Sequence, residues 1–192
     1  MISKSESFLN LAKRRQSVRQ YKPDPIPRGS IDRCLAAANA APSANNGQPW
    51  EFVVAADVAV REQLVRAARF GPVGANRFAG QAPVLIAVIE TAGHRPTRLG
   101  GKLLGRDFPL MDIGMAVENF CLQAADEGLG TCILGLFSAP LVRRALRLPL
   151  SRKPRLLITL GLPADDAIRE KKRIPVGEMS RYIEGKGISN AS

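Results

Sequence analysis

Residues 41–50 read Ala41-Pro-Ser-Ala-Asn-Asn-Gly-Gln-Pro-Trp50, a polar segment between the pattern of a helix and the pattern of a strand. Four hydrogen-bonding side chains fall close together here: Ser43, Asn45, Asn46 and Gln48. Side-chain amides both donate and accept hydrogen bonds, and the flanking prolines limit the conformational freedom that such groups lose on binding a ligand. Because the same composition suits a plain turn, the segment alone leaves a ligand-binding loop and a turn both open.

Helical and strand patterns alternate on both sides of this loop. Before it, the apolar residues from Ile31 to Ala38 recur with helical spacing behind Ser30, the expected N-cap, and Pro42 ends this helix. Further helices are expected over residues 7–13, 60–68, 108–127 and 139–146, and strands over residues 50–56, 83–90, 129–134 and 156–161. Strands separated by helices indicate an α/β or α+β sandwich around one sheet. The 192 residues suit a single domain, with a core over about residues 8–184 and a flexible tail over 185–192.

The expected helix over residues 108–127 is apolar on nearly every side between Leu110 and Ala125. An all-round apolar helix is typical of a central element that its neighbours cover completely. Gly114 and Ala116 are small, which permits close packing against another element, a second copy of the chain included.

The charge balance raises the question of an anionic partner. With 28 Lys and Arg against 17 Asp and Glu, the formal net charge is +11, which attracts nucleic acid, acidic membranes or small anions. The basic residues are spread along the whole chain, and only 5% of residues are aromatic, which leaves few platforms for stacking bases. A nucleic-acid-binding module is therefore a remote alternative.

Several other classes lack their signatures. The three cysteines, Cys34, Cys121 and Cys132, are far apart and are expected to be buried and reduced, and the single histidine, His94, cannot form a His-rich metal site. Neither a Gly-x-Gly-x-x-Gly nor a Walker loop is present. The longest apolar runs, residues 83–89 and 156–160, are too short to cross a bilayer, and the N-terminus lacks a signal-like apolar stretch. We expect a cytoplasmic protein.

A basic cluster, Arg14-Arg-Gln-Ser-Val-Arg-Gln-Tyr21, precedes these elements. Arg15, Ser17 and Arg19 alternate, and in an extended segment alternate residues project to the same side. Two guanidiniums and a hydroxyl on one side form a receptor for a phosphate or another compact anion. Basic runs are also commonly plain solvated surface, so this cluster too leaves both interpretations open when taken alone.

Taken together in this order, the two segments carry a family resemblance. Arg-x-Ser-x-Arg near the N-terminus, followed by Ala-Pro-Ser-x-x-Asn-x-Gln-Pro-Trp, resembles the FMN-dependent nitroreductase family. Weaker matches follow along the chain: Asp112-Ile-Gly-Met-Ala116, Glu127-Gly-Leu-Gly-Thr-Cys-Ile-Leu-Gly135, Leu160-Gly-Leu-Pro163 and Lys171-Lys172-Arg173-Ile-Pro175. The resemblance covers about residues 8–184, which is most of the chain.

The resemblance implies an α+β fold, an α/β/α sandwich whose mostly antiparallel sheet is flanked by helices. It also implies a segment-exchanged homodimer with FMN at the interface. The implied activity is ping-pong transfer of hydride or electrons from NADH or NADPH, through FMN, to a small acceptor such as a nitroaromatic or a quinone. In such an enzyme the flavin carries the chemistry and the protein binds, orients and tunes it. Relatives of the same fold carry out dehalogenation, azoline oxidation or flavin fragmentation, and these chemistries form the main alternative.

The resemblance also implies roles for individual residues. Arg15, Ser17 and Arg19 would contact the phosphate, ribityl or pyrimidine end of FMN, and Lys171 and Arg173 would lie at its phosphate. The other subunit would contribute the loop residues Pro42, Ser43, Ala44 and Asn46. Leu134 and Gly135 would form the turn whose backbone amide points at flavin N5, so no side chain is expected to be catalytic, and no metal is expected.

One position departs from the family pattern, and one basic region allows two interpretations. Many family members have an acidic residue just before the glycine at N5, and here that position is Leu134, which puts the nicotinamide's approach in doubt. The region 93–107 would cover the open face of the flavin and is rich in Lys and Arg. This region is either a plain solvated loop, or it attracts an anionic group, which would be an anionic substrate or the extra phosphate of NADPH.

Overall fold

The computed structural model describes residues 7–69, 75–93, 100, 101, 103 and 105–183. A four-stranded sheet forms its centre, in the order β1 (Trp50–Ala55), β2 (Val84–Glu90), β4 (Lys153–Gly161) and β3 (Gly130–Leu134), with every neighbouring pair antiparallel. Every residue of β2 is buried. A strand that helices cover on both faces reads as a continuous apolar run, and β2 reads Val-Leu-Ile-Ala-Val-Ile-Glu.

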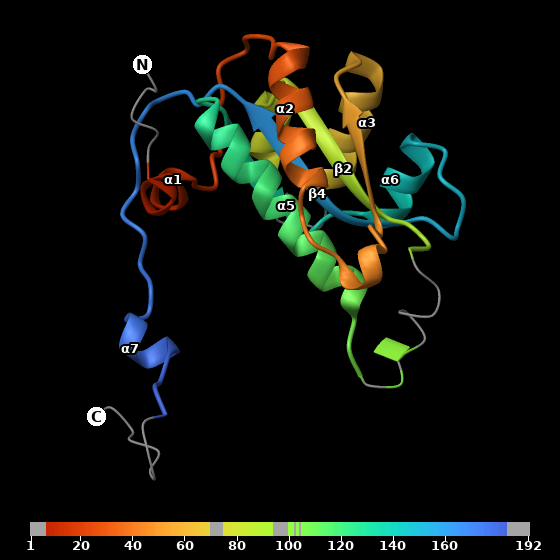
Figure 1. Ribbon diagram of the computed structural model, residues 1–192. Helices are drawn as coiled ribbons and strands as arrows, with labels where there is room; N and C mark the ends of the chain where they lie inside the picture. Colours follow the sequence, from red (N-terminus) through yellow and green to blue (C-terminus); the bar gives the residue numbers. More distant parts are fainter. Residues whose placement is uncertain (1–6, 70–74, 94–99, 102, 104, 184–192) are drawn as a thin grey trace.

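Helices cover both faces of the sheet, so the predicted α/β/α sandwich of the α+β class is confirmed (Figure 1). On one face, α2 (Arg28–Asn39) and α5 (Phe108–Asp126) pack over Ile86 and Val88 of β2. On the other face, α3 (Val58–Ala68) and α6 (Ala139–Ala145) pack over Leu85, Ala87 and Ile89. Successive β2 side chains thus enter opposite cores, as the two-residue period of a strand requires.

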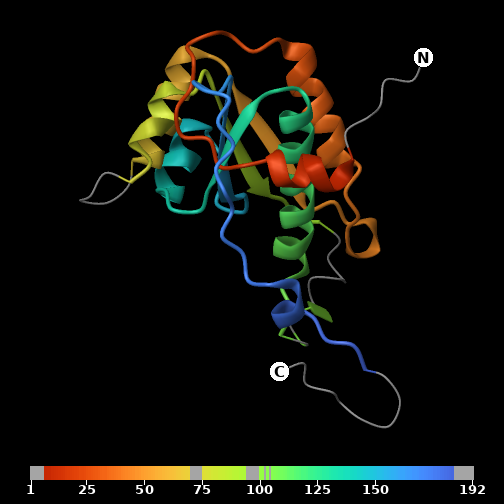
Figure 2. The same cartoon turned by 90° about the vertical axis from the view of Figure 1, so that its left-hand side faces the viewer.

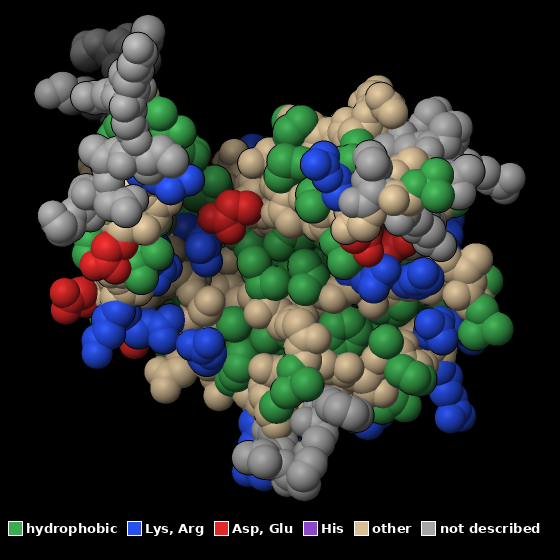
Figure 3. All heavy atoms as spheres, turned by 90° about the horizontal axis from the view of Figure 1, so that it is seen from below, with side chains coloured by type: hydrophobic (Ala, Val, Ile, Leu, Met, Phe, Trp, Pro, Cys, Tyr) green, Lys and Arg blue, Asp and Glu red, His purple; other side chains and the backbone are tan. Residues whose placement is uncertain are grey.

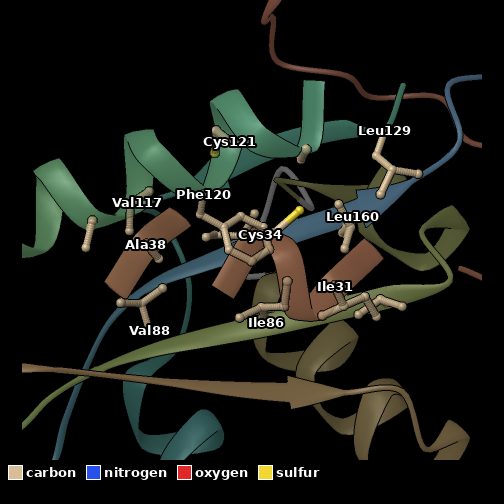
Figure 4. Close-up of a cluster of buried hydrophobic side chains, with 14 of the residues drawn as sticks. Ile31, Cys34, Ala38, Ile86, Val88, Val117, Phe120, Cys121, Leu129 and Leu160 are labelled. Carbon is tan, nitrogen blue, oxygen red and sulfur yellow. The ribbon is translucent and has the colours of Figure 1, made fainter. Parts of the chain in front are cut away.

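The core under α2 and α5 is built around an aromatic side chain. Phe120 of α5 is fully buried, and its ring stacks on Phe52 of β1 with the centroids 5.8 Å apart. Figure 4 shows Phe120 beside Cys34 and near Ile86, which come from α2 and β2. All three cysteines are free and buried, as predicted, and burial raises the pKa of Cys34 to about 12 and that of Cys121 to about 11. These thiols therefore stay protonated and serve as small core residues.

Several element boundaries differ from the prediction, and two of these differences have a clear local cause. Ser30 is not the N-cap of α2, because the helix begins two residues earlier, after Pro27, whose fixed φ suits a helix start. Strand β4 begins at Lys153 instead of 156, because a register shift opposite Val88 and Ile89, with Arg155 as the extra residue on β4, lets the pairing with β2 continue. Charged residues hide this start in the sequence: Lys153 pairs with Glu90 across the strands, and Arg155 forms an ion pair with the buried Glu90 side chain.

Within one chain, the expected helix 108–127, which is α5, is covered on one side only, and its cover by a second copy of the chain stays a prediction. The buried residues of α5 lie on one side, and Leu110, Met111, Gly114 and Met115 on the other side are exposed. Nothing in the described part of the same chain covers this second side. Seen from below, hydrophobic side chains gather in a hollow of the surface, with Lys and Arg side chains around it (Figure 3). An apolar helix face without a cover is the signature of an interaction surface.

The two ends of the chain run side by side along the β3 and β4 edge of the sheet. After α1 (Phe8–Arg14), the segment continues beside β3, where the Val18 N–H donates to the Thr131 carbonyl over 2.8 Å. The segment after β4 pairs with it at Tyr21 and Pro163 and then extends away from the body, ending in α7 (Val176–Met179) (Figures 1 and 2). The expected tail over 185–192 lies outside the described residues. Among the described helices, none combines the length and the apolar character that a membrane crossing needs.

Candidate functional site

A groove of about 390 Å³ lies where the two chain ends meet, and we call it the basic groove. It is lined by Arg15, Gln16, Ser17, Arg19, Arg169, Glu170, Lys171, Lys172 and Arg173. The structure thus brings five of the predicted site residues together, although they come from segments about 150 positions apart in the chain. Six of the nine lining side chains are cationic and one is anionic, so the groove suits an anion.

Hydrogen bonds to Gln16 and Ser17 hold the two segments in register. The Gln16 side chain donates to the Ala167 carbonyl over 2.7 Å and accepts from the Arg169 N–H over 3.1 Å. The Arg169 guanidinium also donates to the Ser17 carbonyl. The sequence reasoning missed Gln16 and Arg169, because their contacts join residues that no local pattern connects. The groove wall is therefore built by backbone and side-chain pairing and not by charge alone.

Lys171 connects the C-terminal segment to the end of α1. Its Nζ donates to the carbonyls of Ala12 and Arg15 over 2.8 and 2.5 Å. Burial, and then the charges of Arg15 and Arg173, lower the pKa of Lys171. A lysine ammonium has three donors, so two of them stabilise the helix end and one is left for a ligand. Lys171 is therefore a structural support of the groove as well as a candidate ligand residue.

The two predicted arginines of the N-terminal cluster approach different neighbours. Arg15 lies 3.2 Å (Nε to Oε1) from Glu118 of α5. The guanidinium carbon of Arg19 lies 5.9 Å from the ring centre of Phe78, a favourable cation–π position. Phe78 belongs to η2, a 3₁₀ helix over Arg77–Gln81. Each arginine is thus held by a partner while both line the basic groove.

Residues 42–48, which we call the polar loop, contain the 3₁₀ helix η1 (Ala44–Asn46) and form a tightly bonded turn. Ser43 Oγ accepts from the Gln48 N–H over 3.0 Å, and the Gln48 side-chain amide donates to Asn46 Oδ1 over 2.9 Å. Asn45, Asn46 and Gln48 all have positive φ, between 41° and 51°. Side chains that were predicted to bind a ligand thus shape a turn, and their role in ligand binding stays a prediction.

The polar loop does not line the basic groove within one chain. It lies near the N-terminal end of α5, where its Ala44 N–H donates to the Asp112 carboxylate (Figure 1). Glu118, which pairs with Arg15, lies six residues further along the same helix. Helix α5 therefore anchors both groups of candidate residues through carboxylates, and the structure leaves the two groups apart.

The turn after β3 presents backbone and not side chains. Leu134 is buried in the core under α3 and α6, whereas Gly135 is exposed, with open space around the position of a Cβ. The following carbonyl, that of Leu136, accepts a 2.8 Å hydrogen bond from Asn76 Nδ2. Asn76 has a φ of 59°, a region that asparagine tolerates better than most residues. Sequence reasoning missed this contact, because nothing in the pattern links residue 76 to the turn.

The structure describes only part of the basic region 93–107. Residues 94–99, 102 and 104, which include His94, Arg95, Arg98 and Lys102, lie outside the described residues. Arg106 is described and exposed. The expectation that this region attracts an anionic substrate therefore stays a prediction.

Comparison with known proteins gives consistent matches. The Nitroreductase family profile matches residues 12–72 and 70–162. A protein of Methanothermobacter thermautotrophicus, provisionally named NADH dehydrogenase/NAD(P)H nitroreductase, is 32% identical over 86% of this chain and 81% of its own. Iodotyrosine deiodinase of Danio rerio is 28% identical over 87% of this chain and 63% of its own. The crystal structure of a nitroreductase family protein from Clostridium novyi NT superposes with a TM-score of 0.74 at 25% identity, over 86% of this chain and 89% of the other.

Proposed function

Because the chain belongs to the nitroreductase family, we propose that it is an FMN-dependent oxidoreductase that uses NADH or NADPH. Its acceptor is a small molecule such as a nitroaromatic or a quinone, and turnover is ping-pong. When bound, FMN supplies the hydride and electron transfer. The cytoplasmic location predicted from the sequence stays a prediction.

The basic groove is the observation that carries this proposal. A phosphate dianion needs several cationic donors, and Arg15, Arg19, Arg169 and Arg173 line one groove together with Lys171. Guanidiniums bind phosphate through two parallel N–H donors. The hydrogen bonds of Gln16 and Lys171 fix the backbone that carries these arginines. The residues present therefore fit the phosphate end of FMN without a glycine-rich loop.

The remaining contacts are those that the family resemblance implies for this chain's residues. Ser17 lies between Arg15 and Arg19 in the chain, lines the same groove, and would bind the ribityl or pyrimidine end of FMN. The exposed backbone of Gly135 would lie at flavin N5, with Leu134 holding the turn through its buried side chain. Pro42, Ser43, Ala44 and Asn46 of the polar loop would approach the ring from the partner subunit.

A homodimer would bring the two halves of this site together. Leu110, Met111 and Met115 are 41%, 55% and 39% exposed, and with Gly114 they form an apolar strip on α5, the helix whose Asp112 and Glu118 contact the polar loop and Arg15. The C-terminal arm beyond the basic groove also exposes apolar side chains, namely Ile174, Val176, Met179, Tyr182 and Ile183. Covering such surfaces stabilises an assembly, and exchange of the arm would cover the second set.

The test is flavin binding by variants of adjacent arginines. Purified protein incubated with FMN and then desalted should be yellow, and a protein that stays colourless would refute the proposal. Arg15→Ala should raise the Kd for FMN about tenfold or more, because a charge-assisted hydrogen bond is lost. Arg14→Ala, one residue away and outside the basic groove, is the matched control. If both variants weaken FMN equally, the cluster acts as diffuse charge and the separate contacts are wrong.

A different chemistry on the same fold is the second candidate. Two similar proteins favour it: iodotyrosine deiodinase, and the 5,6-dimethylbenzimidazole synthase of Rhodobacter capsulatus, which is 29% identical over 70% of this chain. Anaerobic stopped-flow mixing of the FMN-loaded protein with NADH and with NADPH separates the candidates. Bleaching of the flavin by either nucleotide supports the first, and no bleaching by either supports the second. A nucleic-acid-binding module would instead show DNA affinity that falls steeply with salt.

A further inference from the structure

Asp112 is a buried carboxylate on an otherwise apolar side of α5. Its exposed fraction is 5%, and the same helix buries Ile113, Ala116 and Val117 beside it. Burial raises the pKa of Asp112, and the Ala44 N–H partly offsets this rise. Placing an ionisable group here costs stability, so its presence calls for a physical explanation.

Capping of the helix start does not explain why Asp112 is buried. Asp107 already caps α5, because its side chain accepts from the Leu110 N–H over 3.3 Å. Asp112 is the fifth residue of the helix, beyond the first turn that a cap or the helix dipole serves. Its contact leads away from the helix instead: both carboxylate oxygens accept from the Ala44 N–H, over 3.2 and 3.3 Å.

The polar loop needs an external anchor. Three of its non-glycine residues, Asn45, Asn46 and Gln48, have positive φ, a conformation that persists only where surrounding contacts enforce it. The Ser43 to Gln48 hydrogen bond closes the loop on itself but does not fix it to the rest of the protein. The Asp112 contact joins the loop to the long helix at Ala44, between the two side chains proposed to meet the ligand, Ser43 and Asn46.

We infer that Asp112 is a positioning residue, which holds the polar loop in the conformation that binds the partner subunit's FMN. The inference rests on the proposed function for the identity of the ligand. It differs from a role in general stability, because the contact that Asp112 makes is with the polar loop, and its removal takes the acceptor away from the Ala44 N–H of that loop. The carboxylate acts on the loop and touches no reacting atom.

Three variants and two measurements test this role. Asp112→Ala removes the acceptor, Asp112→Asn keeps one oxygen that can accept from Ala44, and Asp126→Asn changes an exposed aspartate of the same helix as the control. Amide hydrogen exchange of peptides spanning residues 42–48 is measured on the FMN-free protein, with the melting temperature. The Kd for FMN is measured on the same samples by quenching of flavin fluorescence.

Asp112→Ala should speed exchange in the polar loop about tenfold, the factor expected when a buried amide loses a charged acceptor. Exchange in the sheet and the melting temperature should stay near those of the original protein. The Kd for FMN should rise by a similar factor, Asp112→Asn should recover most of both losses, and Asp126→Asn should change neither.

Unchanged exchange in the loop, or faster exchange throughout the protein with a lower melting temperature, would overturn the inference. So would a Kd for FMN that stays constant while loop exchange rises. If the original protein does not bind FMN, the proposed function fails, and this outcome is separate because loop exchange is measured without FMN.

Discussion

The two sides of α5 are both apolar, but they meet different surroundings. One side, with Ile113, Val117 and Phe120, is buried against the sheet and α2. The other side, with Met111 and Met115, is exposed in the single chain. An apolar sequence pattern therefore predicts that a surface is covered, but it does not tell whether the same chain or a second chain covers it. The first side should therefore contribute to folding, and the second to association.

The largest expected effect belongs to the buried side. Phe120→Ala should lower the free energy of unfolding by about 3–5 kcal/mol, because it leaves a cavity and removes the stacking contact with Phe52. Urea titration followed by circular dichroism measures the change. Leu150→Ala is the control, since Leu150 is 82% exposed and its truncation should cost less than about 0.5 kcal/mol. Equal losses in the two variants would contradict the division of roles.

The exposed side should govern association. Changing both Met111 and Met115 to Glu should weaken the dimer about a hundredfold or more, because four carboxylates would have to be buried at the interface. Sedimentation velocity over a range of concentrations measures the Kd. A double control changes Leu141 and Leu150 to Glu, since both are exposed and lie on other elements. A chain that remains monomeric without any change would refute the dimer itself.

The same contrast explains how much the sequence could predict. The strands and the long helix followed from apolar periodicity, because the sheet core lies within one chain and its signal is local. Periodicity left an α/β and an α+β sandwich both open, and the family resemblance implied the antiparallel α+β arrangement that the structure has. The start of β4 was missed because Arg155 and Glu90 satisfy each other only once the strands are paired. The sequence predicted that α5 is covered on nearly every side but could not say which side is covered within one chain, because apolar residues on a buried face and on an interface look alike.

The candidate site divides in a similar way. The cationic residues were found because charge and spacing mark them, and the structure gathers four of them, Arg15, Arg19, Lys171 and Arg173, with Ser17 in one groove. Gln16, Asn76 and Glu118 were missed, because each acts on a residue distant in sequence. Asp112 left one signal, a carboxylate within an apolar helix, but only the structure identifies Ala44 as its partner.

Substitution of Gly114 should have the smallest effect on stability, and it separates the folding role of α5 from its role in association most clearly. A Cβ at this position meets nothing within the chain, so Gly114→Ala should raise the stability of the protomer by about 0.5–1 kcal/mol through helix propensity alone. If a second helix packs closely here, the same methyl group keeps the two helices apart and weakens the dimer. Gly29→Ala is the matched control, because Gly29 is an exposed helical glycine of α2 where a Cβ makes only an ordinary contact.

The expected result is therefore a change of opposite sign in two measurements on one variant. Urea titration at concentrations where the chain is monomeric should find both alanine variants more stable, and sedimentation should find only Gly114→Ala weaker as a dimer. If Gly114→Ala gains stability and dimerises as before, the helices do not approach closely at this residue. The association surface would then be centred elsewhere on α5 or on the C-terminal arm, since a close helix contact could not accommodate the added methyl group without moving apart.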